Sequence, residues 1–389
     1  MRVLLAPDCF TGTLSAPQAA AALAEGWRRH APHDVLDVCP LSDGGPGFLE
    51  VLAAALPAGR LEAVTVTGPL GEPVPAGLLV VPGADGGVTA YVESAQACGL
   101  HLVPADRRDP GRTTTRGVGD LLRAALDAGA RRVVVGLGGS GTNDGGAGVL
   151  AALAPPHVVA DPVTGAVVER LAAGGEALRD LTAADLAWLA DVRSDWSGVD
   201  LVVASDVDIG LLGFHGASAG FAAQKGAGPE QAQALERCLG DLAAAATTAL
   251  GLDPKLTATP GAGAAGGLGF GLMLLGATRV PGSTAVLEAV GLPERLRGSD
   301  LVVTGEGCFD WQSLRGKVVA GVARAAMDVG TPVVVVAGQV LVGRREAQTI
   351  GVDAAYPVAE TASQVEAALA DPFRTLADRA ERVARTWSR

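Results

Sequence analysis

Five short apolar segments of this chain each run into a turn of small residues that contains a carboxylate. The apolar runs are mostly continuous rather than alternating, which is typical of strands covered on both faces and therefore of a parallel α/β sheet. In such sheets ligands bind outside the carboxyl ends of the strands. Acids that follow several strands are thus expected to face one crevice, which favours an enzyme over a structural module. The segments are 2–13, 35–47, 132–150, 201–208 and 301–310.

The segment from Arg132 to Leu150 reads RVVVGLGGSGTNDGGAGVL and predicts a buried strand, a tight glycine-rich turn and the start of a helix. Glycines let a backbone approach a ligand closely and present N–H groups to an anion. A carboxylate in such a turn suits a phosphate that carries a divalent cation. The alternative is a plain turn whose Thr or Asn caps the helix. We expect the polar residues of the turn to hold substrate or phosphate: Ser140, Thr142, Asn143 and Asp144.

Composition and charge exclude several classes of partner. A net charge of −12 argues against binding to nucleic acid or to an anionic membrane. The five cysteines form no CxxC or Cys/His cluster, which fits a reduced compartment and gives no zinc signal. We find no signal peptide and no uncharged apolar run approaching the ~20 residues of a membrane span. The sequence therefore predicts a cytoplasmic protein with a small-molecule substrate, and it predicts no particular oligomeric state.

The order of elements indicates two domains, which is also the reasonable prior for 389 residues. Strand and helix alternate at both ends of the chain, whereas residues 62–93 read as short strands with tight turns, typical of an antiparallel meander. We expect residues 1–64 and 286–389 to form one Rossmann-like domain with a parallel sheet. Residues 65–285 would form a second α/β domain inserted into it.

Two phosphate-binding motifs were considered. The segment Gly261–Gly266 matches GxGxxG, but the residues before it make a poor strand, so a Rossmann dehydrogenase is disfavoured. The tract is better interpreted as a small-residue helix start at which Gly266 and Gly267 either pack against a neighbour or face phosphate oxygens. The P-loop pattern GxxxxGK[ST] is absent around Lys317.

Lysine is rare in this chain, with only Lys225, Lys255 and Lys317 among 30 basic residues. Lys225 and Lys317 each lie beside a glycine. A compact ammonium group suits a transferred phosphoryl group, so we expect these two lysines to clamp its charge. The alternative is the chance survival of surface lysines.

The motifs together resemble the bacterial glycerate kinase type I family from end to end. That resemblance implies a kinase that uses ATP and Mg²⁺ to phosphorylate glycerate, typically at the 2-hydroxyl. It also implies two α/β domains with the site in the cleft between them. The matching segments are APDCFTGTLSA (6–16), PLSDGGPG (40–47), GLGGSGTNDGGAG (136–148), ASDVDIGLLGFHGASAGFAAQKGA (204–227), GAGAAGGLGF (261–270) and TGEGCFDWQSLRGK (304–317).

Phosphoryl transfer needs groups that neutralise the triphosphate, hold magnesium and accept the hydroxyl proton. We assign catalytic roles to Asp206, Asp310 and Lys317, and magnesium binding to Asp208 and Glu306. Asp8 and Asp43 are expected to contact the substrate hydroxyl or a metal-bound water. For each acid the alternative is helix capping or a turn carboxylate. We expect Asp8, Asp43, Asp144, Asp206, Glu306 and Asp310 to line one cleft.

The chain also departs from the pattern of the family that it resembles. Several cationic or polar residues that are usual in that family are replaced, which leaves three activities open. The chain is a glycerate kinase, a kinase for another small hydroxy acid, or a non-catalytic paralogue. The altered positions are Thr11, Pro46, Arg116, Ile209, Gly210, His215, Cys308 and Trp311.

Overall fold

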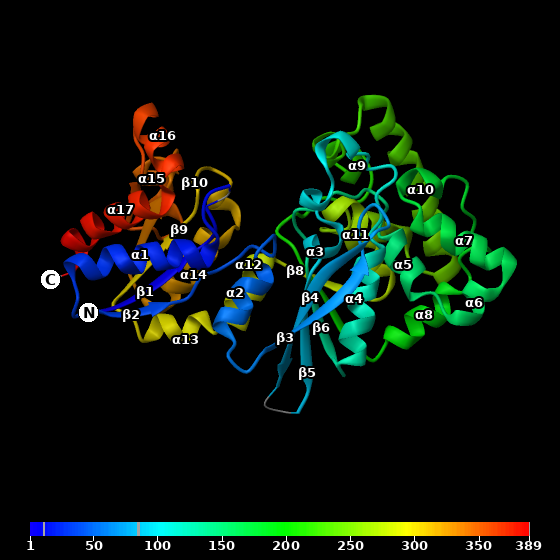
Figure 1. Cartoon of the computed structure of the whole chain (residues 1–389), viewed down its shortest axis with the longest axis horizontal. Coiled ribbons are helices and arrows are strands. Elements are labelled where there is room, and N and C mark those ends of the chain that lie inside the picture. Colours follow the sequence, from blue (N-terminus) through cyan, green and yellow to red (C-terminus); the bar gives the residue numbers. More distant parts are fainter. Residues whose placement is uncertain (11, 84–85, 389) are drawn as a thin grey trace. The chain divides into compact units, whose positions relative to one another are not determined.

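The computed structural model describes residues 1–389 apart from 11, 84–85 and 389. It divides into two compact units. Unit 1 comprises Met1–Asp43, Glu50–Pro57 and Pro281–Arg389, and unit 2 comprises Gly44–Leu49 and Ala58–Val280. Both ends of the chain, blue and orange to red in Figure 1, therefore belong to the same unit.

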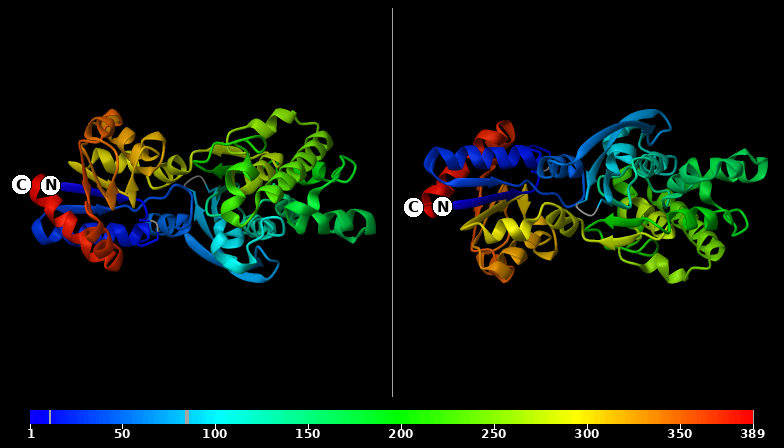
Figure 2. Two further views of the ribbon diagram at one scale, coloured as in Figure 1. Left: turned by 90° about the horizontal axis from the view of Figure 1, so that it is seen from above. Right: turned by 90° about the horizontal axis from the view of Figure 1, so that it is seen from below.

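Unit 1 contains a five-stranded, fully parallel sheet of order β13-β11-β9-β1-β2. Its three inner strands are buried on both faces, as their continuous valine and leucine runs predict, whereas the edge strands β2 and β13 are half-buried or exposed. Helices α1 (Ala16–His30) and α17 (Pro372–Trp387) pack on one face, and α14 (Val318–Val329) covers the other, as Figure 2 shows. The strands are β1 (Arg2–Pro7), β2 (Val35–Val38), β9 (Leu301–Gly305), β11 (Val333–Ala337) and β13 (Ala354–Pro357).

The remaining elements of unit 1 are short. A two-stranded parallel ribbon, β10 (Cys308–Phe309) with β12 (Gln339–Val340), follows β9 and β11 beyond their carboxyl ends. The helices are α12 (Gly282–Ala289), α13 (Leu292–Arg297), α15 (Arg344–Thr349) and α16 (Ala362–Ala370). Helix α1 begins directly after Ser15, because Ser15 and Gln18 form a reciprocal capping box.

Strand order in unit 1 reverses between β1 and β9. From β1 the chain crosses to β2 on one side, whereas from β9 it crosses through α14 to β11 on the other. The carboxyl ends of β1 and β9 therefore border a topological switch point, where a crevice opens because the two connections lead away from each other.

Unit 2 contains a six-stranded sheet of order β3-β4-β5-β6-β7-β8. Strands β3, β4 and β5 pair antiparallel, which confirms the predicted meander, and β5 to β8 pair parallel. Its core is built mainly from Val, Leu and Ala side chains, with a few aromatic and sulfur-containing ones. The strands are β3 (Arg60–Thr67), β4 (Pro73–Pro82), β5 (Val88–Glu93), β6 (Arg132–Gly136), β7 (Asp200–Ala204) and β8 (Thr278–Val280).

The helices of unit 2 include the long α10 (Pro229–Leu250) and α11 (Ala264–Leu274). The others are α3 (Ala95–Cys98), α4 (Arg116–Asp127), α5 (Ala147–Leu153), α6 (Pro156–Ala160), α7 (Pro162–Ala172), α8 (Leu189–Trp196) and α9 (Ala217–Phe221), and α2 (Phe48–Ala55) runs from unit 2 into unit 1. In the described part of the chain no helix is long and apolar enough to cross a membrane.

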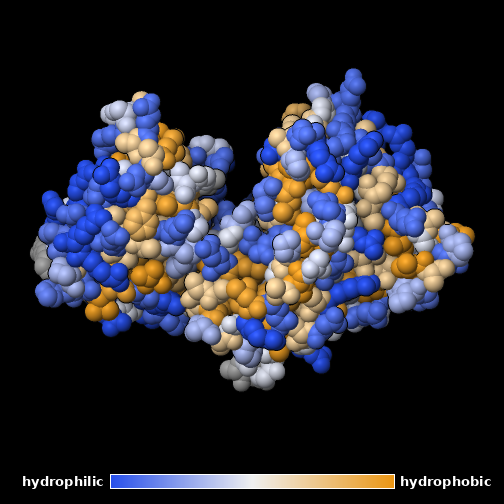
Figure 3. Space-filling view, viewed as in Figure 1, coloured by the Kyte–Doolittle hydropathy of each residue, from blue (hydrophilic) through white to orange (hydrophobic). Residues whose placement is uncertain are grey.

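The expected α/β fold class is therefore confirmed, with parallel strands in both units. The unit boundaries differ from those expected from the sequence. Strand β3 begins at Arg60 and belongs to the sheet of unit 2, whereas we placed the boundary at residue 64. The assignment of 1–64 and 286–389 to one folding domain stays a prediction. On the visible face hydrophilic and apolar residues are interspersed over both units (Figure 3).

A glycine in α4 sets how closely this helix approaches α5. A Cβ on Gly119 would lie 2.5 Å from the Cβ of Ala152 and 3.0 Å from the carbonyl oxygen of Val149. Gly119→Ala should lower the free energy of unfolding by about 1–3 kcal/mol, because overpacking outweighs the gain in helix propensity. Gly240→Ala in α10 is the matched control: nothing lies within 4 Å of its Cβ, so we expect a gain of about 0.5–1 kcal/mol. Urea denaturation measures both, and equal effects of the two substitutions would contradict this packing.

Candidate active site

Two carboxylates lie side by side at the switch point of unit 1. The parallel register pairs Pro7 with Gly305, so the next residues, Asp8 and Glu306, leave β1 and β9 together. The amide of Asp8 donates a hydrogen bond of 2.8 Å to the carbonyl oxygen of Gly305. Both side chains are buried, at 8% and 7% exposure. The sequence pattern of strand followed by acid thus brings these two groups together, and the roles assigned to them stay predictions.

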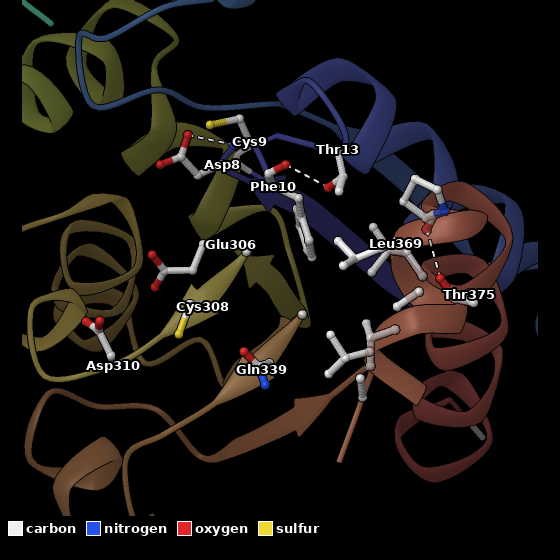
Figure 4. A pocket seen from close by; sticks show the side chains of 18 of the residues that line it. Asp8, Cys9, Phe10, Thr13, Glu306, Cys308, Asp310, Gln339, Leu369 and Thr375 are labelled. Atoms are coloured by element: carbon white, nitrogen blue, oxygen red, sulfur yellow. Dashed lines mark hydrogen bonds between the residues drawn. The ribbon is translucent and has the colours of Figure 1, made fainter. Parts of the chain in front are cut away.

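Three further predicted site residues line the same pocket in unit 1: Asp43, Asp310 and Lys317. Lys317 is the N-cap residue of α14 and makes no side-chain capping bond. The carboxylate Oδ1 of Asp310 accepts hydrogen bonds from the amides of Gln312 (2.8 Å) and Ser313 (3.4 Å), which fixes the orientation of this acid within its turn. Figure 4 shows Asp8, Glu306 and Asp310 in one half of the pocket.

Negative charge is in excess in this half of the pocket. Burial raises the pKa of Asp8 to about 7, and the charges of Asp43 and Glu306 act in the same direction. Burial likewise raises the pKa of Glu306 to about 7, with Asp310 and Asp43 adding to the effect and Lys317 opposing it. Two buried acids beside two half-buried ones, with one lysine near them, are unfavourable unless a cation or protons share the site.

The glycine-rich turn that follows β6 in unit 2 is held from within. Asp144 is fully buried and accepts hydrogen bonds from the amide (2.8 Å) and hydroxyl (2.9 Å) of Thr115 and from the amides of Gly146 and Gly148. Burial raises the pKa of Asp144, and these hydrogen bonds oppose that rise. We therefore revise its expected role: Asp144 shapes the turn and has no surface left for a phosphate.

Lys225 supports the same turn. Its side chain is 2% exposed, and its Nζ donates to the hydroxyl oxygen of Ser140 (3.1 Å) and to the carbonyl oxygen of Thr142 (2.6 Å). Burial lowers the pKa of Lys225 to about 8. We therefore revise the expectation that Lys225 clamps a phosphoryl group. Its ammonium group is buried and its hydrogen bonds go to protein oxygens of the turn, so Lys225 supports the turn instead.

Thr142 and Asn143 are also fully buried. The side-chain amide of Asn143 donates to the hydroxyl of Ser218 at 3.0 Å. Ser140, at 8% exposure, is the polar residue of the turn that lies nearest to solvent. Direct contact of these three residues with substrate stays a prediction.

Gly266 and Gly267 pack against this turn. Both have positive φ, and a Cβ on Gly266 would lie 2.0 Å from the carbonyl oxygen of Thr142. The amide of Gly145 donates to the carbonyl oxygen of Gly266 at 3.0 Å. Of the two roles considered for the GxGxxG-like tract, the structure thus supports packing against a neighbour, and we revise the assignment of both glycines to phosphate binding.

Asp206 and Asp208 lie on the loop after β7 in unit 2, where Asp206 is half-buried and Asp208 exposed. Their assigned catalytic and metal roles stay predictions, as does the shared cleft, because Asp8, Asp43, Glu306 and Asp310 belong to unit 1. No group of three or more His, Cys, Asp or Glu side chains suited to hold a metal ion by itself occurs among the described residues.

Sequence reasoning missed Glu93, the last residue of β5. This buried carboxylate accepts hydrogen bonds from the amides of Gly47 (3.2 Å) and Leu49 (3.1 Å), and so ties the DGGPGF turn and the start of α2 to the sheet of unit 2. The signal was present, since Val88–Glu93 is one more apolar run that ends in an acid.

Some of the positions that depart from the family pattern have identifiable neighbours. Cys308 lines the pocket of unit 1, Trp311 carries the Arg315 guanidinium 5.0 Å from its ring centre, and the exposed His215 lies edge-on to Phe214. A Cβ on Gly139 would touch the ring of Pro46. Thr11 lies outside the described residues.

The parallel sheet with buried acids and a lysine at its switch point defines an α/β enzyme with a polar small-molecule site. Residues 3–388 match the family model described as the glycerate kinase family, and the chain belongs to that family. It is 40% identical to a glycerate kinase of Bacillus subtilis (99% of this chain, 96% of that protein) and 37% identical to a glycerate 2-kinase of Escherichia coli (99% and 98%). The solved structure of a protein assigned as glycerate kinase 2 from Salmonella typhimurium superposes with a TM-score of 0.79 at 37% identity, covering 99% of this chain and 98% of that one. The protein is therefore an enzyme of the kinase class, and the expected family is confirmed.

Lys225 makes the stability of unit 2 depend on pH. Its pKa in the folded protein, about 8, lies below the ordinary 10.5, so between these values the unfolded chain binds more protons and stability rises with pH. The free energy of unfolding of the wild type relative to Lys225→Met should therefore increase by roughly 1.4 kcal/mol for each pH unit from 8 to 10. The free energy of unfolding of the wild type relative to Lys255→Met, a substitution at an exposed site, should not vary with pH over this range. Urea denaturation across this range measures the difference, and parallel profiles for all three proteins would refute a buried ammonium group.

Proposed function

We propose that this enzyme transfers the γ-phosphoryl group of ATP to the 2-hydroxyl of glycerate with Mg²⁺ as cofactor, giving 2-phosphoglycerate. The observation that carries the proposal is the gathering of Asp8, Asp43, Glu306, Asp310 and Lys317 around one pocket at the switch point of unit 1. Acids paired with a lysine suit a phosphate that arrives with a divalent cation. The name of the Escherichia coli relative supports the 2-position of the product.

The donor set of this pocket fits magnesium. Oε1 of Glu306 is buried without a hydrogen-bond partner among the described residues, and burial, with a smaller contribution from the neighbouring acids, raises the pKa of this carboxyl group. Mg²⁺ usually binds through one or two carboxylates together with substrate phosphates, so the lack of a larger metal cluster is consistent with it. We assign Glu306 to hold the ion. Bound there, Mg²⁺ supplies positive charge that offsets the charge of the phosphates.

The chain's own residues then have distinct tasks. The ammonium group of Lys317 and the first amides of α14 offset negative charge that develops on the transferred group. Asp8 accepts a hydrogen bond from the substrate hydroxyl and takes its proton late in the transfer. A pKa near 7 suits this task at neutral pH, because about half of the groups are then deprotonated and the carboxylate is more basic than an ordinary Asp.

A kinase for a different small hydroxy acid is the second candidate. It is favoured by Cys308, an uncharged side chain that lines the pocket where the resembled family usually carries arginine. A coupled assay of ADP release with ATP, Mg²⁺ and a panel of small hydroxy acids tests both candidates, with ³¹P NMR of the product to locate the phosphate. Release with D-glycerate and a 2-phosphate product is the expected result. Release only with another acid would support the second candidate, and the absence of release with every acid would contradict both.

Lys317 gives a direct test of charge stabilisation. Lys317→Ala should lower kcat by about 10² or more, because the interaction strengthens as charge develops on the transferred group. The side chain makes no capping bond, so the fold should persist. Lys255→Ala, at an exposed site of unit 2, is the control and should leave kcat unchanged. An unchanged kcat in a folded Lys317→Ala variant would show that this lysine is only a surface residue.

A further inference from the structure

The pocket of unit 1 is larger than the reaction chemistry at its acidic end requires. Its volume is about 370 Å³, and its lining continues from the acids to residues that the motifs of the sequence did not single out. Figure 4 shows this division: Asp8, Glu306 and Asp310 lie in one half, whereas Leu369 and Thr375 lie in the other. Phe10 and Gln339 lie between the two halves.

The second half of the pocket is apolar. Helices α16 and α17 contribute Val365, Ala368, Leu369, Pro372 and Leu376. The hydroxyl hydrogen of Thr375 is directed at the carbonyl oxygens of Asp371 (2.8 Å) and Pro372 (3.2 Å) at the start of its own helix, so it is not free to donate to a ligand. Leu369 is 62% exposed, and together with the neighbouring apolar residues of α16 and α17 it forms an apolar pocket wall that faces solvent.

The two reactants of the proposed function differ in what they can place here. Glycerate is a three-carbon acid in which every carbon carries oxygen, so it gains nothing from an apolar wall. A nucleoside triphosphate carries negative charge at one end and a flat, largely apolar base at the other. An elongated site with one charged and one apolar half matches the second reactant.

We propose that unit 1 holds the nucleotide, with its phosphates and bound Mg²⁺ at Glu306 and Lys317 and its purine base against the α16–α17 wall. This inference rests on the proposed function and assigns one of its two substrates to one unit. Two independent observations support it: the buried Oε1 of Glu306 without a partner among the described residues, and the solvent-exposed apolar wall at Leu369. Gln339, an exposed residue on the pocket lining between the two halves, has a carboxamide that can pair with a donor and an acceptor on the edge of the base.

Leu369→Asp tests the apolar wall. The substitution removes apolar contact and adds a negative charge, so the Kd for ADP in the presence of Mg²⁺ and the KM for ATP should both rise by about tenfold or more. The KM for glycerate should not change. Met327→Asp, at a residue of α14 that is 58% exposed and does not line the pocket, is the matched control and should alter neither constant. Isothermal titration with ADP and Mg²⁺ provides a readout that does not depend on turnover.

The outcomes separate this inference from the proposed function. An active wild type whose Leu369→Asp variant keeps the Kd for ADP, or shows a raised KM for glycerate instead, would overturn the nucleotide assignment while the function stands. A wild type that binds ADP, loses that affinity in Leu369→Asp and phosphorylates no acid would support the assignment while the function fails. Photolabelling of the wild type with 8-azido-ATP requires no variant, and the label should map to α16 or α17. Labelling confined to peptides of unit 2 would contradict the inference.

Discussion

The parallel hydrogen bonding between β1 and β9 is the constraint on which the candidate site depends. It joins the first strand of the chain to one that begins at residue 301, and its register carries Asp8 and Glu306 out of the sheet as neighbours. A glycine at the end of β9 is required, because a Cβ on Gly305 would lie 2.0 Å from the carbonyl oxygen of Val336 in β11. A shift of this register by one residue would reverse the faces of β9 and separate the two acids.

The electrostatics of the pocket oppose folding and favour ligand binding. Burial raises the pKa of both Asp8 and Glu306 to about 7, so each carboxylate is destabilised relative to water at the pH at which an enzyme works. A metal-bound phosphate would relieve part of this repulsion. The metal charge would therefore make the free energy of nucleotide binding more favourable, in addition to any apolar contacts. In unit 2 the buried charge is handled differently, because Asp144 and Lys225 are both satisfied by hydrogen bonds to the turn that they support.

The sequence predicts the strands well because their signal is local. The apolar runs at the start of segments 132–150 and 301–310 form the strands Arg132–Gly136 and Leu301–Gly305, and the tight turns after residue 62 correctly indicate antiparallel pairing. The acids that follow β1 and β9 come together because parallel strands share one carboxyl edge. The burial of a side chain, by contrast, depends on residues that are distant in the sequence. Lys225 donates to Ser140, which lies 85 residues away in the chain, and the spacing of the two segments does not distinguish a lysine buried against a turn from one that faces solvent.

The same limit applies to the glycines at 266 and 267. The sequence does not distinguish a glycine that contacts a phosphate from one that packs against another backbone. The close approach of the Thr142 carbonyl oxygen to Gly266 identifies the second role in this structure. Glu93 shows the converse case. Its pattern matches the other strand-end acids, yet its oxygens are used to hold the neighbouring turn at Gly47 and Leu49.

A ¹³C NMR titration of the carboxyl groups of Asp8 and Glu306, without divalent cations, tests the central claim most directly. The Asp8→Asn and Glu306→Gln variants provide the resonance assignments. Both groups should have a pKa near 7, and Asp43→Asn should lower both values, because the charge of Asp43 raises the pKa of each. Ordinary pKa values near 3.8 for Asp8 and 4.5 for Glu306, unaffected by Asp43→Asn, would contradict a shared buried site at the junction of β1 and β9.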